Sequence, residues 1–266
     1  MNQDKVKNIL LSTADSLLDF TLIFSGKKSS KVNGLYKPDT REIIIHNKNF
    51  ENGETVDDNG LIYTALHEYA HHQHACKNGG TLPHRSHTTE FWAMFHSLLE
   101  IAQKKGYYKN SIAESSELAK LTKLIKEKFL QKNGELVKDF GKQLVCAMEC
   151  CKKEGIRFED YIDRILCIPR SAAKIAMKMA MYDLHPQVGG DNMRFLANIP
   201  NKQLRIDAEQ SLLEGKSPDT VKMQFKNAKK EDPKLMLVKE RERLRRTIDA
   251  LNKKLEEVER RLDEEI

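Results

Sequence analysis

No long uninterrupted apolar run occurs in this sequence of 266 residues. A helix that crosses a membrane needs about 20 consecutive, mostly apolar residues, so the sequence predicts no membrane span. Residues 1–11 are polar and lack the apolar centre of a signal peptide. We therefore expect a cytoplasmic protein that is not attached to a membrane.

Cysteine is also scarce, since the chain has five, an odd number without a regular framework. Cys146 and Cys150, with Cys151 adjacent, could hold a metal, but no second pair of ligands follows at the spacing of a zinc finger. Four of the cysteines fall on or beside apolar positions of predicted helices, which favours buried free thiols. This usage fits a reducing compartment.

Charged residues make up 32% of the chain and hydrophobic residues 39%. This composition suits two small domains, or one domain with helical appendages that face solvent. The net charge of +6 is mild, and basic residues are interleaved with acidic ones. Such a charge permits a nucleic-acid or acidic partner without requiring one.

Residues 1–108 predict a compact α+β unit, because helical and strand periodicities follow one another along them. The expected elements are a helix over 4–19, a strand over 21–24, a hairpin over 34–46 that turns at Pro38-Asp39, and helices over 61–76 and 88–104. The run Asn78-Gly79-Gly80 ends the helix over 61–76 and reverses the chain.

The rest of the chain is predicted to be helical. A charged amphipathic helix over 109–133 connects to an all-helical region over 134–230, which Gly134 opens. Over 234–266, apolar residues repeat every seven positions with companions between them: Leu237, Leu244, Leu251 and Val258, and Ile248, Leu255 and Leu262. This repeat is typical of a coiled coil and predicts a homodimer; the alternative is a surface helix folded back on its own protein.

The motif that carries chemistry is His67-Glu68-Tyr69-Ala70-His71, an H-E-x-x-H pattern within a predicted helix. Two histidines four residues apart project from one helical face and can share one tetrahedral zinc ion. Glu68 cannot join that pair, but it can reach water at the metal and take its proton. The motif therefore predicts one Zn²⁺ per chain and a hydrolase with Glu68 as its catalytic base.

A third metal ligand has to come from another segment. His74 shares the face of the pair but lies about 10 Å along the helix axis from His67, too far for one ion to bind all three. His87 precedes the next helix after the glycine reversal, so it can approach the first helix. We expect His67, His71 and His87 as ligands, with Glu90 as the alternative third ligand. If His87 binds the metal, Glu90 would instead orient one of the ligands.

These residues resemble the metal site of the SprT-like and YgjP-like metallopeptidases, where a third zinc histidine precedes a short spacer and then Glu-Phe or Phe-Trp. Here His87-Thr88-Thr89 leads to Glu90-Phe91-Trp92. The stretch from Gly34 to Ile45 is similar to the edge strand before the active-site helix of those domains. The resemblance covers about residues 20–105.

The resemblance implies a zincin domain that hydrolyses protein substrates, which in SprT-like proteins are bound to DNA. Two features depart from it: Thr88 stands where glycine is common, and no cysteine-based zinc ribbon follows. ImmA/IrrE-type peptidases share the H-E-x-x-H helix and cleave repressors, so they are a second group that this segment resembles.

Within the helical region, residues 141–174 have the layout of a helix-turn-helix, with a second helix that opens at Pro169. The residues expected to face a DNA groove are Arg170, Ser171, Lys174 and Lys178, and those expected in the core are Ala173, Ile175 and Met177. The stretches 195–200 and 215–221 resemble the helices that follow the helix-turn-helix in ParB-like proteins. The alternative is a helical bundle whose basic residues are only solvated.

Two functions thus compete. The first is a zinc peptidase that the helical region directs to its protein substrate. The second is a DNA-binding regulator whose zincin domain senses a metal or a partner without turnover. Glu68 favours the enzyme, because a purely structural site needs no general base beside an open coordination position.

Overall fold

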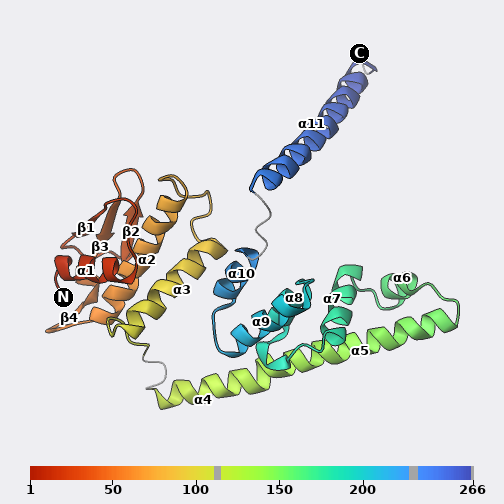
Figure 1. The fold of residues 1–266 in the computed structure, drawn as a ribbon, viewed down its shortest axis with the longest axis horizontal. Coiled ribbons are helices and arrows are strands. Elements are labelled where there is room, and N and C mark those ends of the chain that lie inside the picture. Colours follow the sequence, from red (N-terminus) through yellow and green to blue (C-terminus); the bar gives the residue numbers. More distant parts are fainter. Residues whose placement is uncertain (111–114, 228–232, 265–266) are drawn as a thin grey trace. The chain divides into compact units, whose positions relative to one another are not determined.

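The protein is mostly helical and contains a small mixed sheet, as the computed structural model shows over residues 1–110, 115–227 and 233–264 (Figure 1). This arrangement is compatible with an α+β part followed by a helical one. The chain divides into two compact units, Met1–Met223 and Gln224–Ile266.

The sheet has three short strands: β1 (Thr21–Phe24), β2 (Gly34–Lys37) and β3 (Glu42–Ile45). The central strand is β3, which pairs in parallel with β1 and antiparallel with β2, so the expected strand and hairpin are confirmed. Among the described residues β2 is therefore an edge strand. A 3-10 turn, η1 (Asn47–Phe50), and a two-residue hairpin of β4 (Glu51–Asn52) and β5 (Thr55–Val56) lead to the next helix.

Two helices, α1 (Gln3–Thr13) and α2 (Asp58–Lys77), pack against this sheet, and α3 (Thr89–Lys104) packs against these two helices. The predicted continuation of the first helix to residue 19 is wrong. Ala14 has an extended backbone that ends α1, and Leu17, which the periodicity assigned to the apolar face, is 77% exposed. Leu17 and Leu18 fit the helical spacing by chance, because the chain turns away to run over α2.

The core of this part forms around α2, which is buried along most of its length. Its fully buried side chains come from both helices and strands, and they are Leu10, Leu22, Ile43, Ile45, Leu61, Ile62, Leu66, Tyr69, Phe91 and Phe95. The polar residues His71, His72 and His74 are buried on the same helix. Burying a polar group costs free energy unless it has a hydrogen-bond partner or a ligand. Three buried histidines on one helix therefore indicate that α2 carries a functional site.

The helical region starts with α4 (Ser116–Ile125), the π-helical segment η3 (Lys126–Gln131) and α5 (Lys132–Lys153), which follow one another without a break. Gly134 therefore lies inside a helix instead of opening one. It is buried, and a side chain there would collide with the backbone of Pro186. Gly134, which the sequence predicted to start a helical segment, thus allows the backbones of α5 and Pro186 to approach closely.

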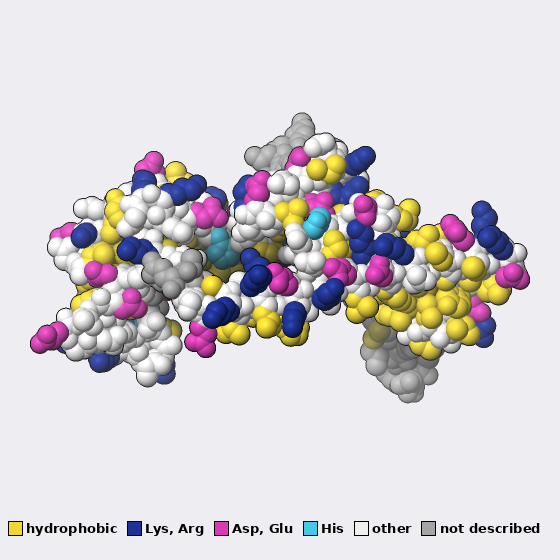
Figure 2. Space-filling model, turned by 90° about the horizontal axis from the view of Figure 1, so that it is seen from below, with side chains coloured by type: hydrophobic (Ala, Val, Ile, Leu, Met, Phe, Trp, Pro, Cys, Tyr) yellow, Lys and Arg dark blue, Asp and Glu magenta, His cyan; other side chains and the backbone are white. Residues whose placement is uncertain are grey.

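Shorter helices complete this region. They are α6 (Phe158–Asp160), η4 (Tyr161–Ile165), α7 (Arg170–Met181), η5 (Pro186–Val188), α8 (Gly190–Ala197), α9 (Lys202–Leu213) and α10 (Pro218–Asn227). Basic and acidic side chains are mixed on the face that Figure 2 shows, with exposed apolar side chains among them.

The buried face of α7 differs from the predicted one. Ala173, Ala176 and Met179 are buried, whereas Ile175 and Met177 are half-buried, because a helix facing α5 buries every third or fourth residue. The expectation of buried thiols is wrong for Cys146, Cys150 and Cys167, which are exposed, and holds for Cys151. The buried residues Gly141 and Leu144 lie on another face of α5 than Cys146 and Cys150.

The last helix, α11, runs over Pro233–Glu264. Five apolar residues of the predicted coiled-coil repeat are exposed on it: Leu244, Ile248, Leu251, Leu255 and Val258. The side chains of Leu237 and Leu262 lie outside the described residues. No helix in the described part of the chain is long and apolar enough to cross a membrane.

Candidate metal centre

Two helices and the loop between them carry the candidate metal ligands. Asp57 caps the start of α2, since its carboxylate accepts the backbone N–H of Gly60, and α2 then places His67 and His71 one turn apart. After α2 ends, the chain returns so that His87 immediately precedes Thr88, the residue whose hydroxyl caps α3. The predicted reversal after the first helix thus brings His87 to the other two histidines.

The three imidazoles converge on one point. The Nε2 atom of His87 lies 3.1 Å from Nε2 of His67 and 3.2 Å from Nε2 of His71. Two nitrogens bound to one tetrahedral ion at about 2.05 Å lie roughly 3.3 Å apart, so these separations fit a shared ion. The group could hold a metal ion, and it is the one group of three or more potential ligands found in the described part of the chain.

Aromatic rings of α3 hold the ligand rings in place. Phe91 stacks on His71 with ring centroids 4.3 Å apart, and Trp92 stacks on His87 at 5.5 Å. The ring of Phe95 meets His67 edge-on. In the sequence, Phe91 and Trp92 belong to the motif that resembles the metallopeptidase site, and their position just after His87 was the available sign that they pack on the ligands.

Burial also keeps the ligands able to bind a metal. Desolvation lowers the pKa of His67 to about 4, with a further effect from His87, and it lowers the pKa of His71 to about 3. Both imidazoles are therefore neutral near pH 7 and have a lone pair to donate. The Nδ1 atom of His71 is buried and has no hydrogen-bond partner among the described residues.

Glu68 lies beside the ligands and under the edge of the sheet. It is 6% exposed, and this burial raises its pKa to about 7, an effect that the nearby Tyr36 backbone partly opposes. Gly34 makes room for it, because a Cβ at that position would come within 3.0 Å of the Glu68 Cγ. A pKa near 7 suits a group that accepts and returns a proton at neutral pH.

The alternative ligand Glu90 is not in the converging group. Its carboxylate lies 3.9 Å from the Nε2 atom of His74, one turn further along α2. Glu90 therefore contacts His74 instead of one of the three candidate ligands, and this contact joins α2 to α3. His84 is exposed in that loop.

The predicted DNA-contacting residues lie on α7, apart from this group. Arg170 is held by Asp163, with its Nε 2.9 Å from a carboxylate oxygen. Ser171 and Lys174 are exposed, and Lys178 is half-buried. Of the four residues, Ser171 and Lys174 are thus the ones presented to solvent without such an ion pair.

No protein-family model matches this chain, and neither a curated protein nor a solved structure does. The chemistry of the site therefore rests on its own residues: three converging imidazoles able to hold a metal ion, and a buried carboxyl group next to them.

Proposed function

We propose that the protein is a zinc-dependent hydrolase that cleaves peptide bonds in a protein substrate. The observation that carries this proposal is the convergence of the His67, His71 and His87 Nε2 atoms with Glu68 beside them. Three converging imidazole nitrogens favour zinc over harder cations such as Mg²⁺ or Ca²⁺, which prefer oxygen ligands. Three protein ligands also leave a fourth position for water or substrate.

The residues around the site would divide the work of hydrolysis. A bound zinc ion would lower the pKa of water and polarise the scissile carbonyl. Glu68 would take a proton from the attacking water and pass it to the leaving amine. Glu68 lies against β2, where Gly34 leaves room for its side chain.

The edge strand β2 offers a place for an extended substrate. The backbone N–H of His46 donates to the Asn33 carbonyl oxygen. In an antiparallel pair the backbone N–H and C=O groups of every second residue point to the neighbouring strand, so along β2 those of Leu35 and Lys37 point toward β3. The backbone N–H and C=O groups of Gly34 and Tyr36 point the other way, toward the open edge of the sheet. A peptide added as a strand at this edge would run beside Glu68, which favours a protein substrate over a small molecule.

The test starts from protein purified without added metal. Elemental analysis should give about one zinc per chain, and incubation with an unfolded protein substrate, with and without DNA, should give cleavage or self-cleavage. The Glu68→Gln protein should keep its zinc and lose the cleavage, because the glutamine amide is close in size but cannot accept the proton. Cleavage that persists in this variant would contradict the assignment of Glu68.

A second function is favoured by the exposed Ser171 and Lys174 at the start of α7. In that function the protein regulates DNA, and its metal-binding domain works as a sensor or interaction module without turnover. Glu68 separates the two functions, since Glu68→Gln would then leave the activity of the protein in the cell unchanged.

A further inference from the structure

The helix formed by α4 and η3 has an apolar face that no other part of the described chain covers. In the described structure neither element contains a buried residue. Four large apolar side chains follow one another at spacings of three and four residues, so they share one face of the helix: Leu118, Leu121, Ile125 and Phe129. Each of them is between 41% and 61% exposed.

Such a face needs a partner to contribute to stability. The ten residues of α4 and the six of η3 form a helix that is marginal in water, because short helices are stabilised mainly by packing an apolar face. The next helix, α5, has this packing, since its Leu144 is buried against Ile162 and Ala173 of the helical region. The apolar face of α4 and η3 has no comparable contact among the described residues, so we looked for its partner outside them.

The polar side of the same helix is basic. Residues 116–132 contain five lysines and two glutamates, which gives a net charge of +3. Lys123 forms an ion pair with a glutamate one turn along the helix. Lys120, Lys126 and Lys128 have no ion pair or hydrogen bond among the described residues. On the face that Figure 2 shows, basic side chains lie next to hydrophobic ones.

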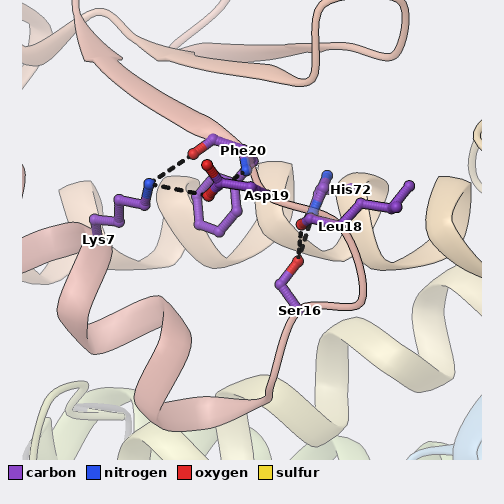
Figure 3. A network of polar contacts seen from close by, with 6 residues as sticks. All are labelled: Lys7, Ser16, Leu18, Asp19, Phe20 and His72. Carbon is purple, nitrogen blue, oxygen red and sulfur yellow. Dashed lines mark hydrogen bonds and ion pairs between the residues drawn. The ribbon is translucent and has the colours of Figure 1, made fainter.

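Lysines in other parts of the protein have partners within the chain. Lys7 of α1 donates to the Phe20 carbonyl oxygen at 2.7 Å and approaches the Asp19 carboxylate, as Figure 3 shows. Lys138 of α5 lies 2.6 Å from the Asp183 carboxylate. The three unpaired lysines of α4 and η3 are instead available to an anionic partner.

An open apolar face next to unpaired lysines is complementary to the surface of an anionic membrane. A helix of this kind lies in the plane of the lipid headgroups, with its leucine and phenylalanine side chains among the acyl chains and its lysines at the phosphates. A second copy of the segment fits less well, because two helices with a net positive charge repel each other. DNA would bind the lysines but would leave the apolar side chains in water.

We propose that α4 and η3 form a surface that binds anionic phospholipid membranes, with the four apolar side chains inserted between the lipids and the lysines against the headgroups. Binding of this kind needs no helix that spans the membrane. It departs from the sequence-based expectation of a protein without membrane contact, which considered only spans and signal peptides. None of the residues involved belongs to the metal centre, so the proposal does not depend on the proposed hydrolysis.

The test measures co-sedimentation of the full chain with vesicles of phosphatidylcholine alone and of phosphatidylcholine with about one third phosphatidylglycerol. The wild type should bind the anionic vesicles at least about tenfold more tightly than the neutral ones at low salt, and this preference should shrink as the salt concentration rises. Lys126→Gln combined with Lys128→Gln should lower the affinity for anionic vesicles about tenfold, because two charges at the headgroups are lost.

The apolar face is tested without a change of charge. Leu121→Gln combined with Ile125→Gln should lower the affinity for anionic vesicles more than about tenfold, because less apolar surface leaves water on binding. The matched control is Leu17→Gln combined with Ile165→Gln, since these side chains are 77% and 70% exposed and lie on other elements. The control should bind within about twofold of the wild type. Both double variants should keep the Tm of the wild type, because the replaced side chains are exposed.

The proposal is overturned if the wild type binds neither kind of vesicle, or if Leu121→Gln with Ile125→Gln binds anionic vesicles as well as the control does. A clear fall of Tm in Leu121→Gln with Ile125→Gln, but not in the control, also overturns it, because the face would then be covered by the protein itself. Vesicle binding requires neither zinc nor turnover, so its failure is distinct from a failure of the proposed function.

Discussion

Burial acts in opposite directions on the two kinds of ionisable residue at the metal centre. It lowers the pKa of His67 to about 4 and of His71 to about 3, and it raises the pKa of Glu68 to about 7. Each shift favours the neutral form, because the charged form is the one that loses hydration. Near neutral pH the histidines therefore carry no positive charge that would oppose a metal cation.

We expect Glu68→Gln to stabilise the metal-free protein more at alkaline than at acidic pH. Because the folded pKa of Glu68 is raised from 4.5 to about 7, its favourable contribution is complete below pH 4.5 and is lost as the pH rises through 7. The variant should gain on the order of 3 kcal/mol over the wild type between about pH 4 and about pH 8. Urea unfolding in the presence of a chelator measures this difference, and a difference independent of pH would contradict the raised pKa.

We expect His87→Ala to lose most of the bound zinc, because it removes one of the three converging Nε2 atoms. Glu90→Ala should keep about one zinc per chain, since its carboxylate faces His74 instead of the ligand group. Elemental analysis after dialysis compares the two variants. Full zinc in His87→Ala together with loss of zinc in Glu90→Ala would show that the choice of third ligand is wrong.

The sequence could indicate the ligand candidates but not what holds them. His67 and His71 follow from a spacing of four residues on a helix, and His87 from a chain reversal. The close approach of Gly34 to the Glu68 side chain joins residues 34 positions apart, and it depends on how strand and helix pack. No local pattern in one sequence encodes such a contact.

At the scale of whole elements, helices and strands with a clear periodicity were predicted well and their ends less so. The hairpin of β2 and β3 was found from its alternation and its Pro38-Asp39 turn. The end of α1 was missed, because Leu17 and Leu18 keep helical spacing beyond it. The prediction for Gly134 was wrong, because a glycine that lets a neighbouring backbone pack closely cannot be told from sequence alone from a glycine that begins a segment.

The face of α7 leads to a prediction about DNA. Arg170 is engaged with Asp163, so Lys174 is the basic residue of this face that is both exposed and outside that ion pair. If α7 contacts DNA, Lys174→Ala should weaken binding and reduce the slope of log affinity against log salt by about one, since one phosphate contact is lost.

Mobility shift or fluorescence anisotropy at several salt concentrations measures this slope for the full chain. Lys153→Ala is the matched control, because Lys153 is exposed at the end of α5 and carries the same charge. If the wild type shows no shift at low salt, or if the two variants bind equally, the helix-turn-helix interpretation fails and the bundle interpretation stands.

At the scale of the whole molecule, α11 forms with its preceding residues a compact unit separate from Met1–Met223. A single helix of this composition gains little stability from its own residues, because helices in water are stabilised mainly by packing an apolar face. The sequence repeat predicted the apolar face of α11. Which surface packs against this face cannot be predicted from the repeat alone, because it depends on the partner. Exposed leucines spaced by seven favour another copy of the same helix.

We therefore predict a parallel homodimer through α11, which Leu251→Asp should dissociate. The Leu251 side chain is 58% exposed on the single helix and would be buried at the seam, where a charge costs more than the roughly 2 kcal/mol of the lost leucine burial. Light scattering should give twice 30.6 kDa for the wild type and 30.6 kDa for Leu251→Asp. Lys253→Gln changes the net charge equally but lies off the repeat, so it should stay dimeric. Monomeric masses for both the wild type and a chain ending at Pro233, with higher peptidase activity in the shorter chain, would contradict the dimer and favour a helix that folds back as an inhibitor.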